Sequence, residues 1–164
     1  MKSQVFIALG SNRGDRELNL LRGVAELGKI PGARVVALSG FYETEAVGGP
    51  DQPDFVNAVV RLETSLDPRQ LLAELQRIEN EVFRRVRTLR WGPRSMDLDI
   101  LFFGDLITAG DDLTIPHPRL HERRFVLEPL AEIAPEFVHP LLNRNVADLL
   151  DGVGKNERVV KIQE

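Results

Sequence analysis

The chain has 164 residues, of which 43% are hydrophobic and 28% charged, with a net charge of −4 at neutral pH and no cysteine. The length suits one domain with its own core, and the lack of cysteine excludes disulfides and thiolate metal sites and fits a reducing compartment. The negative charge disfavours nucleic acid and anionic lipid, so we expect neither a nucleic-acid nor a membrane partner. We also expect a single domain over residues 1–164, cytoplasmic and monomeric.

The N-terminal part of the chain predicts a strand, a helix and a second strand. Val5–Leu9 is typical of a buried strand, and it is too short for a signal peptide or a membrane span. Asp15 is a suitable N-cap for the helix that follows. The apolar positions of this helix at helical spacing are Leu18, Leu21, Ala25 and Gly28, with Leu20, Val24 and Leu27 broadening the face. After Pro31-Gly32 we expect a strand over Arg34–Leu38 that continues toward Tyr42.

The middle of the chain predicts a loop, a strand and a second helix. Residues 45–54 contain two glycines and two prolines and should form the loop. Phe55–Glu63 should form the strand. Asp67 followed by Pro68 predicts a helix start, because proline is favoured at the first helical position. The apolar face of this helix should carry Leu71, Leu72, Leu75, Ile78 and Val82.

The C-terminal part predicts one more core strand and further helical segments. The strand should cover Met96–Phe103, and the helical segments lie around Phe125–Ile133 and Val146–Leu150. The core order is then β-α-β-β-α-β. This pattern is typical of the ferredoxin-like α+β fold, an antiparallel sheet with helices packed on one face, here with extra C-terminal helical elements.

Two aspartates interrupt the last predicted strand. Because alternate residues of a strand point to the same face, Asp97 and Asp99 should lie side by side. Paired carboxylates among apolar residues repel each other, and Mg²⁺ would relieve that repulsion, with substrate phosphates as its further ligands. The alternative interpretation is two solvated acids paired with nearby arginines. A D-x-D pattern is common, so the neighbouring residues decide between the two.

Those neighbours form an arginine-rich segment over residues 84–94 that contains no acid. Within it, Trp91 offers a flat face for a heterocycle, and the arginines at either side match phosphate oxygens two at a time. Gly92-Pro93 predicts a tight bend that aims Arg94 toward the aspartates. A solvated loop with surface ion pairs would need neither the tryptophan nor the bend. We therefore expect a site for a polyanion carried by metal.

Other residues are weaker candidates for ligand contacts. Gln76 and Glu79 lie one helical turn apart, His117 stands between two prolines, and Phe55 and Asn57 share a strand face. Each has an ordinary alternative, as a solvent-facing, loop or core residue. The glycines near residues 10–14 and 152–155 do not have the spacing of a dinucleotide-binding or P-loop motif. If ATP binds, arginines and metal must hold its phosphates.

Taken together, these motifs resemble the 6-hydroxymethyl-7,8-dihydropterin pyrophosphokinase family of folate biosynthesis. The matching segments are Ala8–Asn12, Phe41–Thr44, Asp51–Asn57, Gln76–Glu79, Arg85–Arg87, Arg90–Ile100 and Pro116-His117. They are spread in order over nearly the whole chain, and the longest is highly specific to the family. The resemblance implies the ferredoxin-like fold and an enzyme that transfers the terminal two phosphates of ATP to the pterin hydroxymethyl group, leaving AMP.

The resemblance also implies roles for individual residues. Asp97 and Asp99 would bind two Mg²⁺ ions, and Arg85 and Arg94 would act catalytically in the transfer. Contacts to ATP would come from Gln76, Glu79, Arg87, Trp91, Arg94, Ile100, His117 and Arg123. The pterin pocket would be formed by Thr44, Val47, Phe55, Asn57, Trp91 and Phe125, with the ring held between the two phenylalanines.

Some positions depart from the family pattern. Phe55 stands where tyrosine is frequent, and Glu45 stands where proline is often found. Arg84 directly precedes Arg85, and either one is a candidate for the phosphate contact. Two other functions also stay open on the residues alone. One is a small RNA-binding domain, and the other is a two-metal nucleotidyl-transfer or hydrolase domain, which would release pyrophosphate or ADP in place of AMP.

Overall fold

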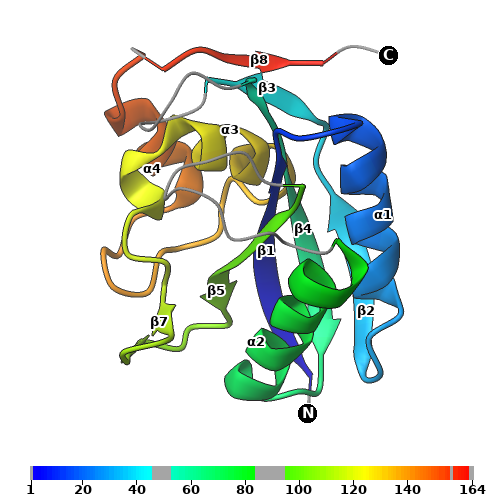
Figure 1. Ribbon diagram of the computed structural model, residues 1–164. Helices are drawn as coiled ribbons and strands as arrows, with labels where there is room; N and C mark the ends of the chain where they lie inside the picture. The colour runs from blue at the N-terminus through cyan, green and yellow to red at the C-terminus, as the bar shows by residue number, and fades with distance from the viewer. Residues whose placement is uncertain (1, 46–52, 84–94, 156, 163–164) are drawn as a thin grey trace.

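The computed structural model describes residues 2–45, 53–83, 95–155 and 157–162. Figure 1 shows a central sheet with helices on both faces. Its strands are β1 (Ser3–Ser11), β2 (Ala33–Leu38), β3 (Tyr42–Thr44), β4 (Phe55–Thr64), β5 (Asp97–Phe103) and β8 (Val159–Lys161). The pairing order is β5-β1-β4-β3-β8, and β2 also pairs with β4. The predicted β-α-β-β-α-β core is confirmed, with β2 and β3 together in the place of one edge strand.

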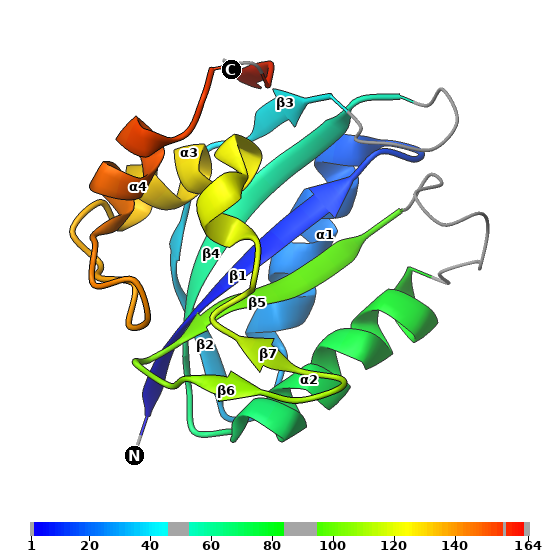
Figure 2. The same ribbon diagram turned by 90° about the vertical axis from the view of Figure 1, so that its left-hand side faces the viewer.

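Helices α1 (Arg16–Gly28) and α2 (Pro68–Arg77) cover one face of the sheet, and α3 (Arg124–Ile133) and α4 (Val146–Gly152) cover part of the other (Figure 2). A two-stranded sheet of β6 (Thr108–Ala109) and β7 (Thr114–Ile115) lies beside β5. The predicted helices on one face and the extra C-terminal helices are both confirmed. None of the helices in the described residues is long and apolar enough to cross a membrane.

Two hydrophobic cores form because alternate residues of the central strands point to opposite faces. Val5, Ile7 and Leu9 of β1 pack under α1 and α2. Phe6 points the other way and packs with Phe102 and the residues of α3 and α4. Both clusters are fully shielded from water at their centres, so each face of the sheet contributes hydrophobic stabilisation of its own.

The predicted apolar face of α1 is wrong at its main positions but right at Leu20 and Leu27, and Asp15 caps the helix by accepting a hydrogen bond from the Leu18 amide. Leu18 and Leu21 are about half exposed, and Leu20 and Leu27 are buried. The reason is Gly23, where a side chain would lie 2.8 Å from the Met96 methyl carbon. A residue without a side chain allows the helix to approach the sheet closely, and this contact decides which face turns inward.

The second predicted strand does not run on to Tyr42 but ends at Leu38, and β3 begins separately at Tyr42. Ser39 lies between them, and its hydroxyl accepts a hydrogen bond from the Val59 amide at 2.9 Å. The side chain thus takes the place of a backbone acceptor, and the pairing with β4 changes register. The short strand β3 is thereby set at the end of the sheet that carries Asn57.

Helix α2 begins as predicted. The Asp67 side chain accepts from the Gln70 amide while the Gln70 side chain accepts from the Asp67 amide, which makes a capping box. Leu71, Leu75 and Ile78 are buried, as the sequence predicts. The helix does not stop after Arg77 but continues as a π-helical turn over Ile78–Val82.

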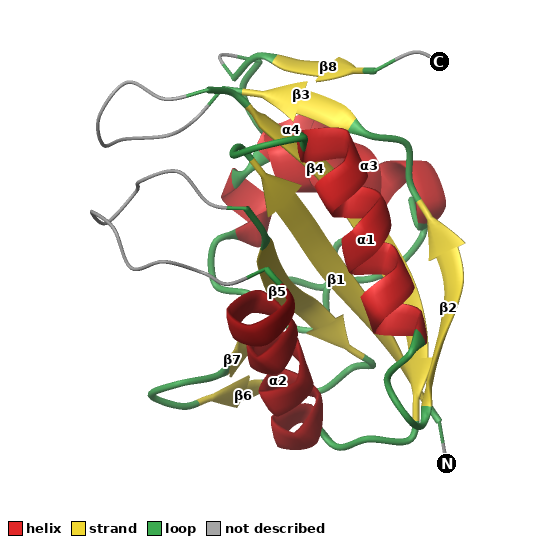
Figure 3. Ribbon diagram, turned by 45° about the vertical axis from the view of Figure 1, so that its right-hand side comes forward, coloured by secondary structure: helices red, strands yellow, loops and turns green. Residues whose placement is uncertain are grey.

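The C-terminal strand β8 pairs with β3 and extends the sheet beyond the ferredoxin-like core (Figure 3). Glu132 of α3 joins these elements. It accepts hydrogen bonds from the Tyr42 hydroxyl at 2.6 Å and the Gly40 amide at 2.9 Å, and it forms an ion pair with Lys161 at 3.3 Å. Burial and the neighbouring Glu132 carboxylate raise the pKa of Tyr42 well above its usual value.

Tyr42 is the only tyrosine of the chain, so its ionisation can be followed directly by near-ultraviolet absorbance. We expect no phenolate signal from the folded protein near pH 10, where an exposed tyrosine titrates. Because the pKa of Tyr42 is raised in the folded state, its contribution to the free energy of unfolding is complete below about pH 10 and is lost at higher pH. The urea-unfolded protein should titrate normally, and Glu132→Gln should lower the native pKa. A native titration near 10 would contradict the buried contact.

Candidate active site

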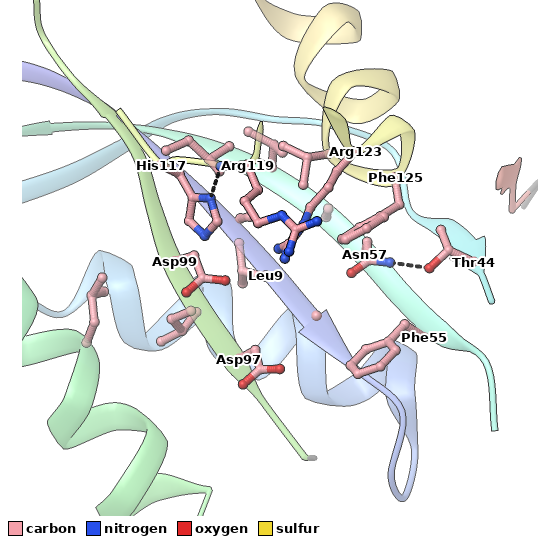
Figure 4. Close-up of a pocket in the computed structure, with 18 of the residues that line it drawn as sticks. Leu9, Thr44, Phe55, Asn57, Asp97, Asp99, His117, Arg119, Arg123 and Phe125 are labelled. Carbon is pink, nitrogen blue, oxygen red and sulfur yellow. Dashed lines mark hydrogen bonds between the residues drawn. The ribbon is translucent and has the colours of Figure 1, made fainter. Parts of the chain in front are cut away.

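A cavity of about 530 Å³ opens at the end of the sheet where β1 finishes and where β4 and β5 begin. The register places Gly10 of β1 between Asn57 of β4 and Asp97 of β5. One wall comes from the turn at Leu120–Glu122 and the start of α3, and the other reaches α2 past the edge strand β5. Strands far apart in sequence therefore bring the predicted candidates together (Figure 4).

Asp97 and Asp99 lie on the same face of β5, as strand alternation predicts, and Figure 4 shows both carboxylates on the cavity side of the strand. Asp97 is half-buried and Asp99 is exposed, whereas Leu98 between them is buried on the opposite face. Within the described residues, no group of three or more His, Cys, Asp or Glu side chains is placed to hold a metal. Two carboxylates that need further oxygen ligands from a substrate fit Mg²⁺.

Glu79 is buried, and one of its carboxylate oxygens accepts a hydrogen bond from the Leu98 amide at 2.7 Å. It stands in the π-helical turn after α2, an irregularity that often marks functional sites. The contact fixes the backbone of β5 at the residue between the two aspartates. Glu79 lines the cavity as predicted, and its observed contact gives it a role in positioning β5.

Gln76 is exposed and lines the cavity from the last turn of α2. Ile100, by contrast, points its side chain into the core between the sheet and α1 and α2. A ligand contact from Ile100 would therefore have to come from its backbone, which lies on the edge strand of the sheet.

The opposite end of the cavity combines aromatic rings with an amide. Asn57 donates a hydrogen bond to the Thr44 hydroxyl at 2.6 Å, and Thr44 is buried. The rings of Phe55 and Phe125 lie on either side of Asn57 (Figure 4). Gly10 makes room for this group, because a side chain there would meet the Asn57 amide oxygen at 2.7 Å. The predicted sandwich of Phe55 and Phe125 is compatible with this arrangement.

Partly buried polar contacts hold the backbone that leads into Phe55. Asn12 donates to the Pro53 carbonyl at 3.1 Å, and Arg16 donates to the Asp54 carbonyl at 2.8 Å and to Glu43 at 2.9 Å. Satisfied polar groups of this kind resist displacement, since a broken partner leaves a buried group unpaired. The loop after β1 therefore positions the aromatic end of the cavity.

His117 lies at the cavity rim, with its amide bonded to the Leu101 carbonyl at 3.0 Å. Its Nδ1 accepts a hydrogen bond from the Arg119 amide at 3.3 Å, which leaves the proton of the neutral ring on Nε2. Burial, together with the charges of Arg123 and Arg119, lowers the pKa of His117 to about 4. The ring is thus a neutral donor at physiological pH, beside two permanent cations.

Sequence reasoning missed three charged residues that line the cavity, namely Arg119, Glu122 and Glu157. Arg119 carried a usable signal, because it stands two residues after the candidate His117. Glu157 carried none. The predicted residues Val47, Arg85, Arg87, Trp91 and Arg94, together with the alternative Arg84, lie outside the described residues, so their roles stay predictions.

Residues 6–135 match the family model described as 7,8-dihydro-6-hydroxymethylpterin-pyrophosphokinase. The chain is 47% identical over 135 residues to the 2-amino-4-hydroxy-6-hydroxymethyldihydropteridine pyrophosphokinase of Haemophilus influenzae, covering 82% of this chain and 84% of that protein. It is 48% identical over 136 residues to the protein of the same name from Bacillus subtilis, covering 83% of this chain and 81% of that protein.

The fold is also similar to the crystal structure of Plasmodium falciparum HPPK-DHPS with pterin and p-hydroxybenzoate, with a TM-score of 0.72 and 18% sequence identity. The match covers 92% of this chain but 43% of that longer chain. At this identity the similarity concerns the fold alone, and it agrees with the ferredoxin-like fold predicted from the sequence.

The depressed pKa of His117 has a consequence for stability. An unfolded histidine binds its proton near pH 6.5 and the folded one near 4, so the unfolded state binds more protons between these values. The unfolding free energy should therefore fall as the pH is lowered through this window, by at most about 1.4 kcal/mol per pH unit for this group. Urea denaturation of the wild type and His117→Gln should show a shallower slope in the variant. A His117 imidazole signal that titrates near 6.5 in nuclear magnetic resonance, identified by its loss in His117→Gln, would contradict the assignment.

Proposed function

This chain belongs to the 7,8-dihydro-6-hydroxymethylpterin-pyrophosphokinase family, and we propose that its cleft transfers the pyrophosphoryl group of ATP to the hydroxymethyl group of 6-hydroxymethyl-7,8-dihydropterin. The chain is a pyrophosphokinase of folate biosynthesis, which removes the RNA-binding alternative. The observation that carries the proposal is that one cleft joins a ring-binding end to a phosphate-binding end. The second product is AMP.

The ring-binding end is formed by Phe55, Phe125, Asn57 and Thr44. Two aromatic faces stabilise a flat heterocycle by stacking, and the amide and hydroxyl can orient it through hydrogen bonds. The Asn57 amide donates to Thr44, so its oxygen is the natural acceptor for a ring N–H. This end therefore suits the pterin, as the sequence predicts for these residues.

The phosphate-binding end is formed by Asp97 and Asp99 on one side and by Arg119, Arg123 and His117 on the other. Arginine forks hold phosphate oxygens, and the neutral His117 adds an N–H donor. We propose that Asp97 and Asp99 hold two Mg²⁺ ions when ATP is bound. Bound Mg²⁺ would neutralise the charge that develops on the phosphate oxygens.

The chain's own residues act mainly by positioning. The pterin hydroxyl must be aimed at the β-phosphorus of ATP, and holding both substrates in one cleft supplies that orientation. Glu79 contributes by fixing the backbone at Leu98, which keeps the two aspartates in place. The residues predicted to assist the transfer, Arg85 and Arg94, belong to the arginine-rich segment outside the described residues.

The proposed function is tested by incubating the protein with ATP, Mg²⁺ and 6-hydroxymethyl-7,8-dihydropterin and separating the products. We expect AMP and a pyrophosphorylated pterin in equal amounts, and neither product without the pterin. ADP or free pyrophosphate as the main product would instead indicate a hydrolase or a nucleotidyl transferase. The reaction should stop when a chelator removes the divalent cation.

Replacing either acidic residue of β5 tests the metal assignment. Asp97→Asn and Asp99→Asn keep the size of each side chain but remove a charged ligand, so turnover should fall at least about a hundredfold. Thermal unfolding should stay close to that of the wild type, because neither aspartate belongs to either hydrophobic core. Asp105→Asn, an exposed aspartate in the turn after β5, is the matched control and should keep full activity. Full activity in an Asp97 or Asp99 variant would contradict the assignment.

A further inference from the structure

The C-terminal segment of the described chain reaches back to the cleft. Glu157 lines the cavity together with Thr44, Phe55, Asn57 and Phe125, the residues of its ring-binding end. It lies beyond residues 6–135, the region that matches the family model. The role of Glu157 therefore has to be argued from its own surroundings.

One oxygen of the Glu157 side chain, Oε2, is shielded from solvent and has no hydrogen-bond partner in the part of the chain that the structure describes. A buried acceptor without a donor is unfavourable, and in native proteins such a group often marks a site where something else supplies the partner. Because Glu157 lines the cavity, a rotation of its side chain would bring the carboxylate to an N–H group of a molecule bound there.

Two neighbouring arginines form no hydrogen bond or ion pair with the Glu157 carboxylate within the described residues, because other acids bind them. Arg124 binds the Glu128 carboxylate at 2.8 Å and 3.0 Å, and it donates only to the backbone carbonyl of Glu157, at 3.2 Å. Arg158 pairs with the Asp54 carboxylate and lies 3.8 Å from that of Glu45. Both cations therefore fix the backbone around Glu157 and leave its carboxylate oxygen for another donor.

The position of Glu157 relative to the ring-binding end is also fixed by the sheet. Strand β8 begins two residues later and pairs with β3, with Val159 opposite Thr44 (Figure 3). Arg158 lies near the carboxylates of Asp54, which directly precedes Phe55, and Glu45, which directly follows Thr44. The segment thus holds the backbone of Glu157 near the residues that would surround the heterocycle.

A carboxylate limits which part of a substrate can lie beside it. It accepts hydrogen bonds and repels phosphate, so it suits a ring edge with N–H donors and not the triphosphate. The aminopyrimidine edge of a pterin carries a ring N–H and an amino group. We propose that Glu157 is a specificity-determining residue that accepts a hydrogen bond from this edge, an inference that rests on the proposed function.

Binding measurements on Glu157→Gln and Glu157→Ala test the inference. Calorimetry with 6-hydroxymethylpterin, Mg²⁺ and α,β-methylene-ATP should show pterin binding weakened about tenfold to a hundredfold in both variants. The affinity for the nucleotide analogue should not change. Thermal unfolding without ligands should be unchanged or higher, because both variants remove a partly buried negative charge and Glu157→Ala also removes the unpaired acceptor. Glu136→Gln, an exposed acid outside the cavity, is the matched control and should bind like the wild type.

A second ligand separates recognition from general packing. In 6-hydroxymethyllumazine the amino group is replaced by an oxo group, so the wild type should prefer the pterin, and Glu157→Gln should lose most of that preference. Unchanged pterin affinity in the variants, or a joint loss of pterin affinity, nucleotide affinity and thermal stability, would overturn the inference alone. If the wild type binds no pterin, the proposed function fails with it.

Discussion

The site depends on the antiparallel register of β1 with its two neighbours. Gly10 stands opposite Asn57 on one side and Asp97 on the other, so this pairing alone brings the ring-binding end and the phosphate-binding end into one cleft. A slip of one residue would turn Asp97 and Asn57 to the opposite face of the sheet. The two hydrophobic cores prevent such a slip, because it would also remove Val5, Ile7 and Leu9 from the core under α1 and α2. Stability of the sheet and assembly of the site are therefore one requirement.

The cleft is also divided by charge. Glu157 and Glu45 lie toward the ring-binding end. Arg119, paired with Glu122, and His117 lie toward the two aspartates, and Arg123 lies over the Phe125 ring. A triphosphate in the reverse orientation would place its charge beside carboxylates, so electrostatics favours a single arrangement of the substrates. The low pKa of His117 follows from the same division, because a protonated ring would add a third positive charge to a partly desolvated group. Recognition and orientation thus share one set of residues.

Much of the fold was predictable because local signals agreed with the global pattern. The cap at Asp15, the Asp67-Pro68 helix start and the apolar runs of β1 and β4 each favour the element that forms. The face of α1 was not predictable, since apolar residues surround this helix and the choice depends on how Gly23 fits against Met96. The gap between β2 and β3 was hidden for a similar reason, because it depends on a hydroxyl of Ser39 that bonds to another strand.

The site likewise combines features that follow from local sequence with features that depend on contacts between distant residues. The shared face of Asp97 and Asp99 follows from the two-residue period of a strand, which a short stretch of sequence contains in full. The contact of Glu79 with the Leu98 amide depends on a π-helical turn, and the residue pattern did not predict that turn. Glu157 reaches the cleft only because β8 pairs with β3, a long-range contact between short strands with weak local signals.

One oxygen of Glu157 is buried and has no partner in the described part of the chain, which is unfavourable, and burial keeps the ring of His117 neutral. They lie at opposite ends of the same cleft, while the interior of the sheet and its two cores consist of well-packed apolar residues. A substrate that donates to the first group and accepts from the second would form hydrogen bonds with both at once. Binding energy would then come partly from hydrogen bonds to polar groups that lie largely out of water, and a ligand with the wrong hydrogen-bonding edge would not form them.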